Sequence, residues 1–108
     1  MISQDNFKIT ASELKQCIKN ITLLDVREQE EFNAAHIEGC KLIPLGEIML
    51  RAEKELDKNA DIVIYCAHGM RSMQALNAMK RIGFSKLRSL EGGIAVWAQE
   101  NGPTLSSR

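Results

Sequence analysis

Two kinds of apolar pattern alternate along this chain, and they predict strands and helices in turn. Strands are predicted where apolar residues run together or alternate with polar ones, at 7–9, 22–26, 40–43, 62–65 and 86–90. Helices are predicted where apolar residues recur every three or four positions, at 12–21, 27–32, 47–56, 71–82 and 94–100. Strands that alternate with helices indicate an α/β sandwich, with a mainly parallel sheet of about five strands and helices on both faces.

Several residues are placed where they would begin or end these helices. Thr10 and Glu13 have the spacing of a capping box, so the first helix is expected to start beside them. Gly83 follows the helix at 71–82 and is expected to end it. Asn101 is expected to end the last helix in a left-handed conformation.

Composition and charge narrow the class of protein. The 108 residues suit one domain, 1–108, with 104–108 expected to be a frayed tail. Lys plus Arg and Asp plus Glu number 14 each, and this balance does not favour a nucleic-acid partner. No apolar run approaches 18 residues and the first residues do not resemble a signal peptide, so we expect no membrane partner and a cytoplasmic location.

The three cysteines are Cys17, Cys40 and Cys66, and no two of them have the Cys-x-x-Cys spacing. With two histidines far from them, the sequence does not favour a metal site. Cys17 belongs to the apolar face of a predicted helix, and we expect Cys17 and Cys40 to be core residues.

Cys66 stands where a buried strand gives way to a helix. Backbone N–H groups of the intervening loop, the helix N-terminus and Arg71 all favour a thiolate there. Gly69 permits a tight loop. The sequence therefore predicts an anion pocket around a nucleophilic sulfur, although a small buried hydrophobic role for Cys66 is the alternative. His68 is expected at an exposed loop tip, His36 in local packing, and Met70 at the pocket mouth or in the core.

Four segments, in order, resemble the rhodanese-type sulfurtransferases. Cys66-Ala67-His68-Gly69-Met70-Arg71 is similar to that family's Cys-x-x-Gly-x-Arg active-site loop. The other three are Leu24-Asp25-Val26-Arg27 with Glu31-Phe32, then His36-Ile37-Glu38-Gly39-Cys40 with Ile43-Pro44, and Gly92-Gly93-Ile94 with Trp97 and Pro103. Together they span nearly the whole chain. The family often has alanine where Cys40 stands, and glycine where Asn101 stands.

The resemblance implies a rhodanese-like three-layer sandwich and a sulfur-transfer activity without a cofactor. Cys66 would take the outer sulfur of thiosulfate or of a persulfide donor, and would pass it to a thiol, or to cyanide in vitro. Arg71 would stabilise the anionic donor and the loop, and the backbone amides from Ala67 to Arg71, those of Ala67, His68, Gly69 and Met70 included, would hold the persulfide. Asp25 and Arg27 would be supporting residues. The implied partners are a small sulfur-donor anion, a thiol acceptor and a sulfur-relay protein. The sequence does not determine an oligomeric state.

Two other functions remain open at this point. A Cys-dependent phosphatase or arsenate reductase uses Cys-x5-Arg, whereas four residues separate Cys66 from Arg71 here. A persulfide carrier or binding module with little turnover on small molecules would have the same Cys66 and Arg71.

Overall fold

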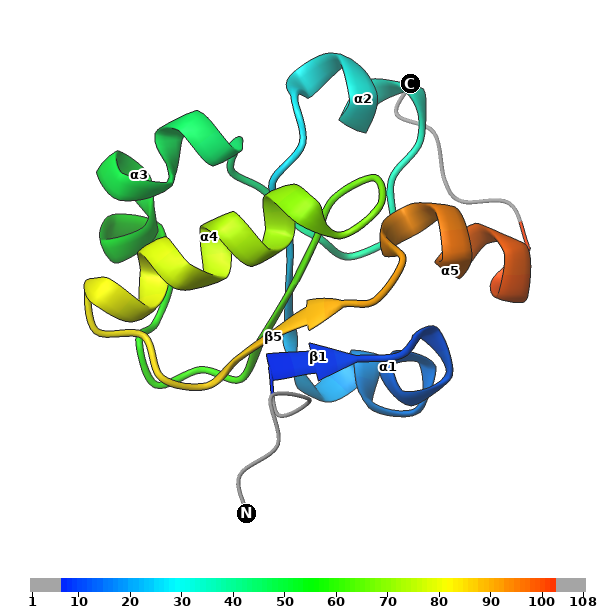
Figure 1. Ribbon diagram of the computed structural model, residues 1–108, viewed down its shortest axis with the longest axis horizontal. Helices are drawn as coiled ribbons and strands as arrows, with labels where there is room; N and C mark the ends of the chain where they lie inside the picture. The colour runs from blue at the N-terminus through cyan, green and yellow to red at the C-terminus, as the bar shows by residue number, and fades with distance from the viewer. Residues whose placement is uncertain (1–6, 103–108) are drawn as a thin grey trace.

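The computed structural model describes residues 7–102, and the tail predicted at 104–108 lies outside that range. Within it the strands are β1 Lys8–Ile9, β2 Thr22–Asp25, β3 Lys41–Leu42, β4 Ile62–Tyr65 and β5 Leu87–Leu90. The helices are α1 Ala11–Cys17, α2 Gln29–Ala34, α3 Ile48–Glu55, α4 Met70–Arg81 and α5 Gly93–Asn101, with 3-10 turns η2 Ile18–Asn20 and η3 Leu45–Glu47. The predicted alternation of strands and helices is confirmed (Figure 1).

The strands form one sheet in the order β1-β5-β4-β2-β3, and their pairings are parallel. β4 is the central strand, and its four residues are buried because both faces of the sheet are covered. Its register places Asp25 of β2 beside Tyr65 and Ser89 of β5 beside Ile64. Three strand ends therefore meet at the edge where Cys66 begins.

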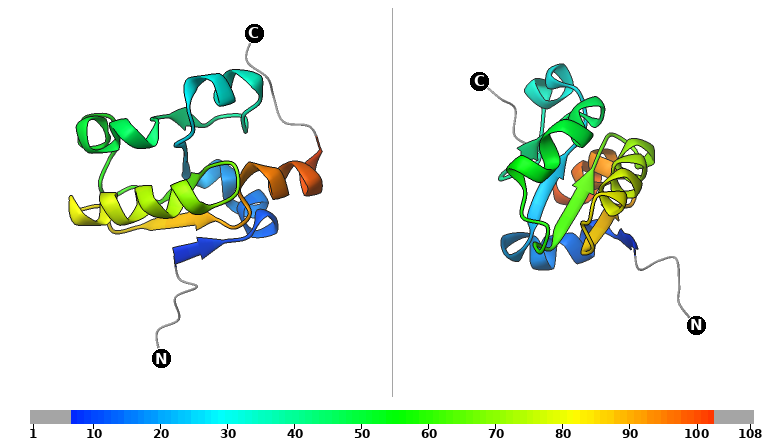
Figure 2. Two further views of the ribbon diagram at one scale, coloured as in Figure 1. Left: turned by 45° about the horizontal axis from the view of Figure 1, so that its top comes forward. Right: turned by 90° about the vertical axis from the view of Figure 1, so that its left-hand side faces the viewer.

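Two apolar cores lie on opposite faces of the sheet. Leu24, Ile62 and Ile64 face residues of α3 and α4 on one side. Val63 and Tyr65 face residues of α1 and α5 on the other. The views in Figure 2 show helices on both sides of the strands, so the α/β sandwich with helices on both faces is confirmed.

Local sequence explains the start of α1 and the end of α4. The predicted capping box is present, because the Thr10 side chain accepts the Glu13 N–H and the Glu13 side chain accepts the Thr10 N–H. Gly83, with φ of 105°, follows α4 as expected. Both ends are therefore determined by residues next to them in the sequence.

Several helix boundaries differ from the prediction. The first helix was expected to reach Ile21, but α1 ends at Cys17 and the chain continues as a 3-10 turn. The helix expected at 27–32 begins at Gln29, because Arg27 is buried in an ion pair instead. Asn101 remains helical, and Gly102, with φ of 84°, makes the turn expected of Asn101.

Among residues 7–102, no helix has both the length and the apolar character needed to cross a lipid bilayer.

Candidate active site at the cysteine loop

The cysteine loop, residues 66–71, connects the central strand to α4. Strand side chains alternate between faces, so Cys66 points to the same face as Ile62 and Ile64, beneath the start of α4. Cys66 is 1% exposed. Gly69 has φ of 117° and caps α4, a conformation that a residue with a Cβ rarely adopts. The predicted junction of buried strand, glycine turn and helix is therefore present.

Hydrogen-bond donors surround the sulfur of Cys66. The backbone N–H groups of Gly69 and Ser72 donate to Sγ at 3.0 and 3.3 Å, and the Cys66 thiol donates to the Ser72 hydroxyl oxygen 3.6 Å away. Burial opposes ionisation of the thiol, but the Ser72 hydroxyl and the N–H groups of Ser72, Gly69 and His68 outweigh it and lower the pKa of Cys66. This is the anion pocket that the sequence predicts, and it suits a thiolate or a persulfide anion.

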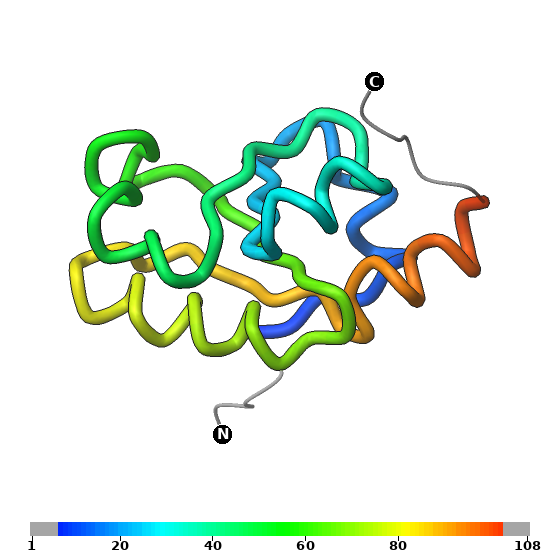
Figure 3. The backbone as a smooth tube through the Cα atoms, turned by 90° about the horizontal axis from the view of Figure 1, so that it is seen from above, coloured from blue at the N-terminus to red at the C-terminus, as the bar shows by residue number. Residues whose placement is uncertain are grey.

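The first turn of α5 fixes the orientation of the loop peptides. The N–H groups of Ile94 and Ala95 donate to the carbonyl oxygens of Cys66 and Ala67 at 2.9 and 3.2 Å. A trans peptide points its N–H away from its C=O, so the N–H groups that follow these carbonyls turn away from α5. Figure 3 shows the loop (light green) beside the start of α5 (orange).

Gly93 makes this close approach possible. A Cβ built on Gly93 would lie 2.4 Å from both the Cys66 and the Ala67 carbonyl oxygens. Gly93 also has φ of 62°, in the left-handed region. The Gly92-Gly93 pair therefore forms the turn into α5 and also leaves room for the carbonyl groups of the cysteine loop.

Arg71 is paired with Glu31 of α2. Its two terminal nitrogens each lie 2.8 Å from a different Glu31 oxygen, a bidentate geometry. Both side chains are 34% exposed. The Arg71 guanidinium lowers the pKa of Glu31 to about 2, and Glu31, more than Cys66, raises the pKa of Arg71. The positive charge expected at the loop is present, but a carboxylate already binds it.

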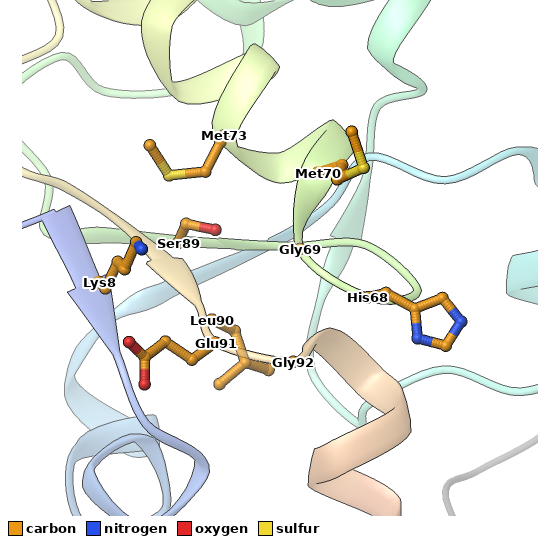
Figure 4. Close-up of a pocket in the computed structure, with 9 residues that line it drawn as sticks. All are labelled: Lys8, His68, Gly69, Met70, Met73, Ser89, Leu90, Glu91 and Gly92. Carbon is orange, nitrogen blue, oxygen red and sulfur yellow. The ribbon is translucent and has the colours of Figure 1, made fainter.

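The other loop side chains differ in exposure. His68 and Met70 are exposed, Met70 by 79%, and Ala67 is half-buried. The exposed position predicted for His68 is confirmed. Beside the loop is a cavity of about 190 Å³ lined by Lys8, His68, Gly69, Met70, Met73, Ser89, Leu90, Glu91 and Gly92. Figure 4 shows the His68 ring directed away from Ser89 and Met73.

Asp25 and Arg27 form a buried ion pair with N···O of 2.8 Å. Arg27 also donates to the Ala35 carbonyl oxygen at 2.7 Å, and its guanidinium carbon lies 5.5 Å from the Tyr65 ring centre. Tyr65 faces the α5 side of the sheet, whereas Cys66 faces the α4 side. Asp25 and Arg27 therefore contact each other on the α5 side of the sheet, whereas the Cys66 thiol lies on the α4 side.

The remaining cysteines and His36 have local contacts. Cys40 is half-buried with Sγ 3.4 Å from the Tyr65 hydroxyl, and Cys17 packs partly buried against the same core. His36 stacks on Phe32 with ring centroids 3.9 Å apart, so its predicted local packing is confirmed. Among residues 7–102, no three His, Cys, Asp or Glu side chains gather as metal ligands would.

Three residues near the loop were not selected from the sequence. Ser72 and Ser89 are buried and hydrogen-bonded to each other, and Glu31 binds Arg71. Glu31 was named only as part of a motif. Two features of the sequence could have identified them. Ser89 occupies an inward position of a predicted strand, and Glu31 is an acid within a segment that resembles the family.

Comparisons with known proteins show the family to which the chain belongs. The family model of the rhodanese-like domain matches residues 10–100. A Bacillus subtilis protein, named "Putative sulfur carrier protein YrkF", is 44% identical over 79 residues, which are 73% of this chain and 42% of YrkF. The solved rhodanese-like domain of an Anabaena protein is 33% identical with a TM-score of 0.86, covering 93% of this chain and 79% of that one.

A Mycobacterium tuberculosis protein, named "Probable adenylyltransferase/sulfurtransferase MoeZ", is 37% identical over 101 residues, which are 90% of this chain. This chain spans only 26% of MoeZ and 42% of YrkF. The resemblance drawn from the sequence motifs is confirmed, because the family model covers most of the described residues. The chain belongs to the rhodanese-like domain family.

Proposed function

We propose that this chain transfers sulfane sulfur, which it holds as a persulfide on Cys66. The observation that carries the proposal is the set of donors around Cys66 Sγ, with two backbone N–H groups at 3.0 and 3.3 Å in a loop held by α5. A thiolate in such a cradle is a nucleophile that needs no separate base. Membership of the family, and the names of MoeZ and YrkF, support the same chemistry.

In the first step the Cys66 thiolate attacks the outer sulfur of a donor. With thiosulfate, a bond forms between Cys66 Sγ and the outer sulfur, and the donor S–S bond breaks with its electron pair on sulfite. The Cys66 persulfide anion that remains carries one negative charge on its outer sulfur. The N–H groups of Ala67, His68, Gly69, Met70 and Arg71 are the donors we assign to that sulfur.

In the second step an acceptor thiolate attacks the outer sulfur of the persulfide. The new bond forms on the acceptor, and the Cys66 thiolate leaves with the electron pair of the broken S–S bond. Hydrogen bonds from Gly69 and Ser72 stabilise that leaving thiolate. Cyanide would serve as acceptor in vitro and yield thiocyanate. Asp25 and Arg27 act as supporting residues beneath the strand end.

A persulfide carrier role is the second candidate, and the Arg71–Glu31 pair favours it. A free arginine at the loop would attract a dianionic donor, whereas this one is already neutralised by a carboxylate. Donor and acceptor would then be cysteines of relay proteins rather than small anions. A phosphatase role is not supported, because four residues separate Cys66 from Arg71 and Arg71 turns to Glu31.

Turnover of thiosulfate and cyanide to thiocyanate tests the proposal. Wild type and Cys17→Ala should form thiocyanate equally, and Cys66→Ala should form none above background. If wild type is inactive with thiosulfate but passes sulfur from a persulfidated peptide to a thiol, the carrier role holds. Sulfur transfer that survives in Cys66→Ala, or fails with both donors, would overturn the proposal.

A further inference from the structure

A pair of buried hydroxyls lies in the apolar layer between α4 and β5. Ser72 and Ser89 are 0% and 2% exposed, and their Oγ atoms are 2.6 Å apart. Leu76 and Met79 of α4 and Leu87 of β5 belong to the same layer. A polar pair in such a place is unusual, because two apolar side chains would fill it without needing hydrogen bonds.

The Ser72 hydroxyl has more acceptors than protons. Cys66 Sγ lies 3.6 Å from Ser72 Oγ, the Gly69 carbonyl oxygen 3.1 Å and Ser89 Oγ 2.6 Å. A serine hydroxyl donates one hydrogen bond and accepts up to two. If Ser72 donated to Ser89, the sulfur would receive no hydrogen bond from this hydroxyl. If Ser89 donates to Ser72, the Ser72 proton is left to the Gly69 carbonyl oxygen, which it contacts while Cys66 is a thiol, and to the sulfur once Cys66 is a thiolate.

The surroundings of Ser89 favour the second arrangement. Among residues 7–102 the Ser89 side chain hydrogen-bonds to Ser72 alone, so its proton has Ser72 Oγ as its protein acceptor. Ser89 also lines the cavity beside the loop, on the side of β1 (Figure 4).

We infer that Ser89 is a positioning residue for Cys66, acting through Ser72: by donating to Ser72 Oγ it polarises the Ser72 O–H and strengthens the hydrogen bond that this hydroxyl gives to the thiolate. The benefit of stabilising the thiolate rests on the proposed function, in which the Cys66 thiolate attacks in the first step and leaves in the second. Its geometry does not depend on any donor or acceptor.

Other charged and titratable groups surround the loop and must be held constant in a test. Glu31 of α2 and Arg71 form an ion pair beside the loop, and Lys8, His68 and Glu91 line the adjoining cavity. A single change at Ser89 leaves all of them in place. A difference between variants of Ser89 therefore reports on the hydroxyl.

The test titrates the Cys66 thiolate by its ultraviolet absorbance in a chain whose other cysteines are replaced, Cys17→Ala with Cys40→Ala. Tyr65, the single tyrosine, does not interfere, because burial raises its pKa. Ser89→Thr and Ser89→Val are the compared variants, since their side chains have nearly the same shape and both suit a strand. Ser85→Ala, at an exposed serine before β5, is the control.

Ser89→Thr and Ser85→Ala should keep the wild-type midpoint, and Ser89→Val should raise it by about 0.3 to 0.5 pH unit, because the Ser72 O–H loses the donor that polarises it. In a Ser72→Ala background the Thr and Val variants should have the same midpoint. Equal midpoints in the original background, or a Thr–Val difference that persists without the Ser72 hydroxyl, would overturn the inference. Because no sulfur donor is present, a failure of the proposed function would leave this result unaffected.

Discussion

The N–H of Ile94 donates a 2.9 Å hydrogen bond to the carbonyl oxygen of Cys66, and so the start of α5 orients the peptide that follows the thiol. These residues are 28 positions apart and belong to different elements. A second hydrogen bond, from the Ala95 N–H to the Ala67 carbonyl oxygen, orients the peptide between Ala67 and His68 in the same way. The geometry of the cysteine loop therefore depends on α5 as well as on its own sequence.

Gly93→Ala should damage the loop through this contact. Its Cβ would lie 2.4 Å from the Cys66 carbonyl oxygen, and its φ of 62° would be strained as well. We expect urea unfolding to show a loss of about 3 kcal/mol, and sulfur transfer to fall more than tenfold.

Gly46→Ala is the matched control for Gly93. A Cβ at Gly46 meets nothing within 4 Å, and Gly46 does not have a positive φ. Its stability should change by no more than about 0.5 kcal/mol, with activity unchanged. Equal effects of the two substitutions would contradict the role assigned to Gly93.

Arg71 and Glu31 should act on an anionic donor in opposite directions. Arg71→Ala removes a positive charge and should raise the KM for thiosulfate about tenfold, whereas Glu31→Gln removes a negative charge and should lower it several-fold. A neutral persulfide donor should distinguish the variants far less. Steady-state kinetics with both donors checks this. If both variants lost thiosulfate activity to the same extent as persulfide activity, the pair would only hold the loop.

Acid should weaken the link between α2 and the cysteine loop. The pKa of Glu31 is about 2 in the folded chain, against an ordinary value of 4.5. A carboxylate with a lowered folded pKa stabilises the fold above its unfolded pKa, and that stability is lost as pH falls from about 4.5 toward 2. Since the Glu31 side chain is 34% exposed, we expect its carboxylate to contribute only about 1 kcal/mol to the free energy of unfolding.

Urea unfolding of wild type and Glu31→Gln at several pH values measures that effect. The difference between the two proteins should be about 1 kcal/mol at pH 7 and should approach zero near pH 2. Other carboxylates titrate in both proteins and cancel in the difference. A difference independent of pH would show that the ion pair is not its source.

The buried Asp25–Arg27 pair should matter more for stability than an exposed pair. Asp25 is fully buried, so Asp25→Ala leaves a buried guanidinium without its carboxylate, at a cost of about 3–5 kcal/mol. Asp61→Ala, which removes the exposed partner of Arg88, should cost less than about 1 kcal/mol. Unfolding curves for the two variants compare them directly. Similar losses would mean that Asp25 is not needed to balance Arg27.

Sequence patterns predicted those parts of the fold that depend on near neighbours. The buried run at 62–65, the capping box at Thr10 and the turn at Gly83 each follow from a few adjacent residues. The change from α1 to a 3-10 turn at Ile18 keeps the same apolar spacing, so periodicity could not reveal it.

The contacts around the thiol could not be read in the same way. The Cys66 loop was visible as a strand–glycine–helix junction, but Glu31 and Arg71 are 40 positions apart, and Ser72 and Ser89 are 17 apart. Only the packing of α2 and β5 against the loop brings these side chains together. Asp25 and Arg27 were predicted to support the site, and their place on the opposite face depends on strand register.

Intact mass after incubation with thiosulfate or a small persulfide donor, without reductant, tests the central claim most directly. Wild type, Cys17→Ser and Cys40→Ser should each gain the mass of one sulfur atom, and a thiol acceptor should then remove it. Cys66→Ser should gain none. A sulfur adduct that persists in Cys66→Ser, or one that disappears in Cys40→Ser, would contradict the assignment of the persulfide to Cys66.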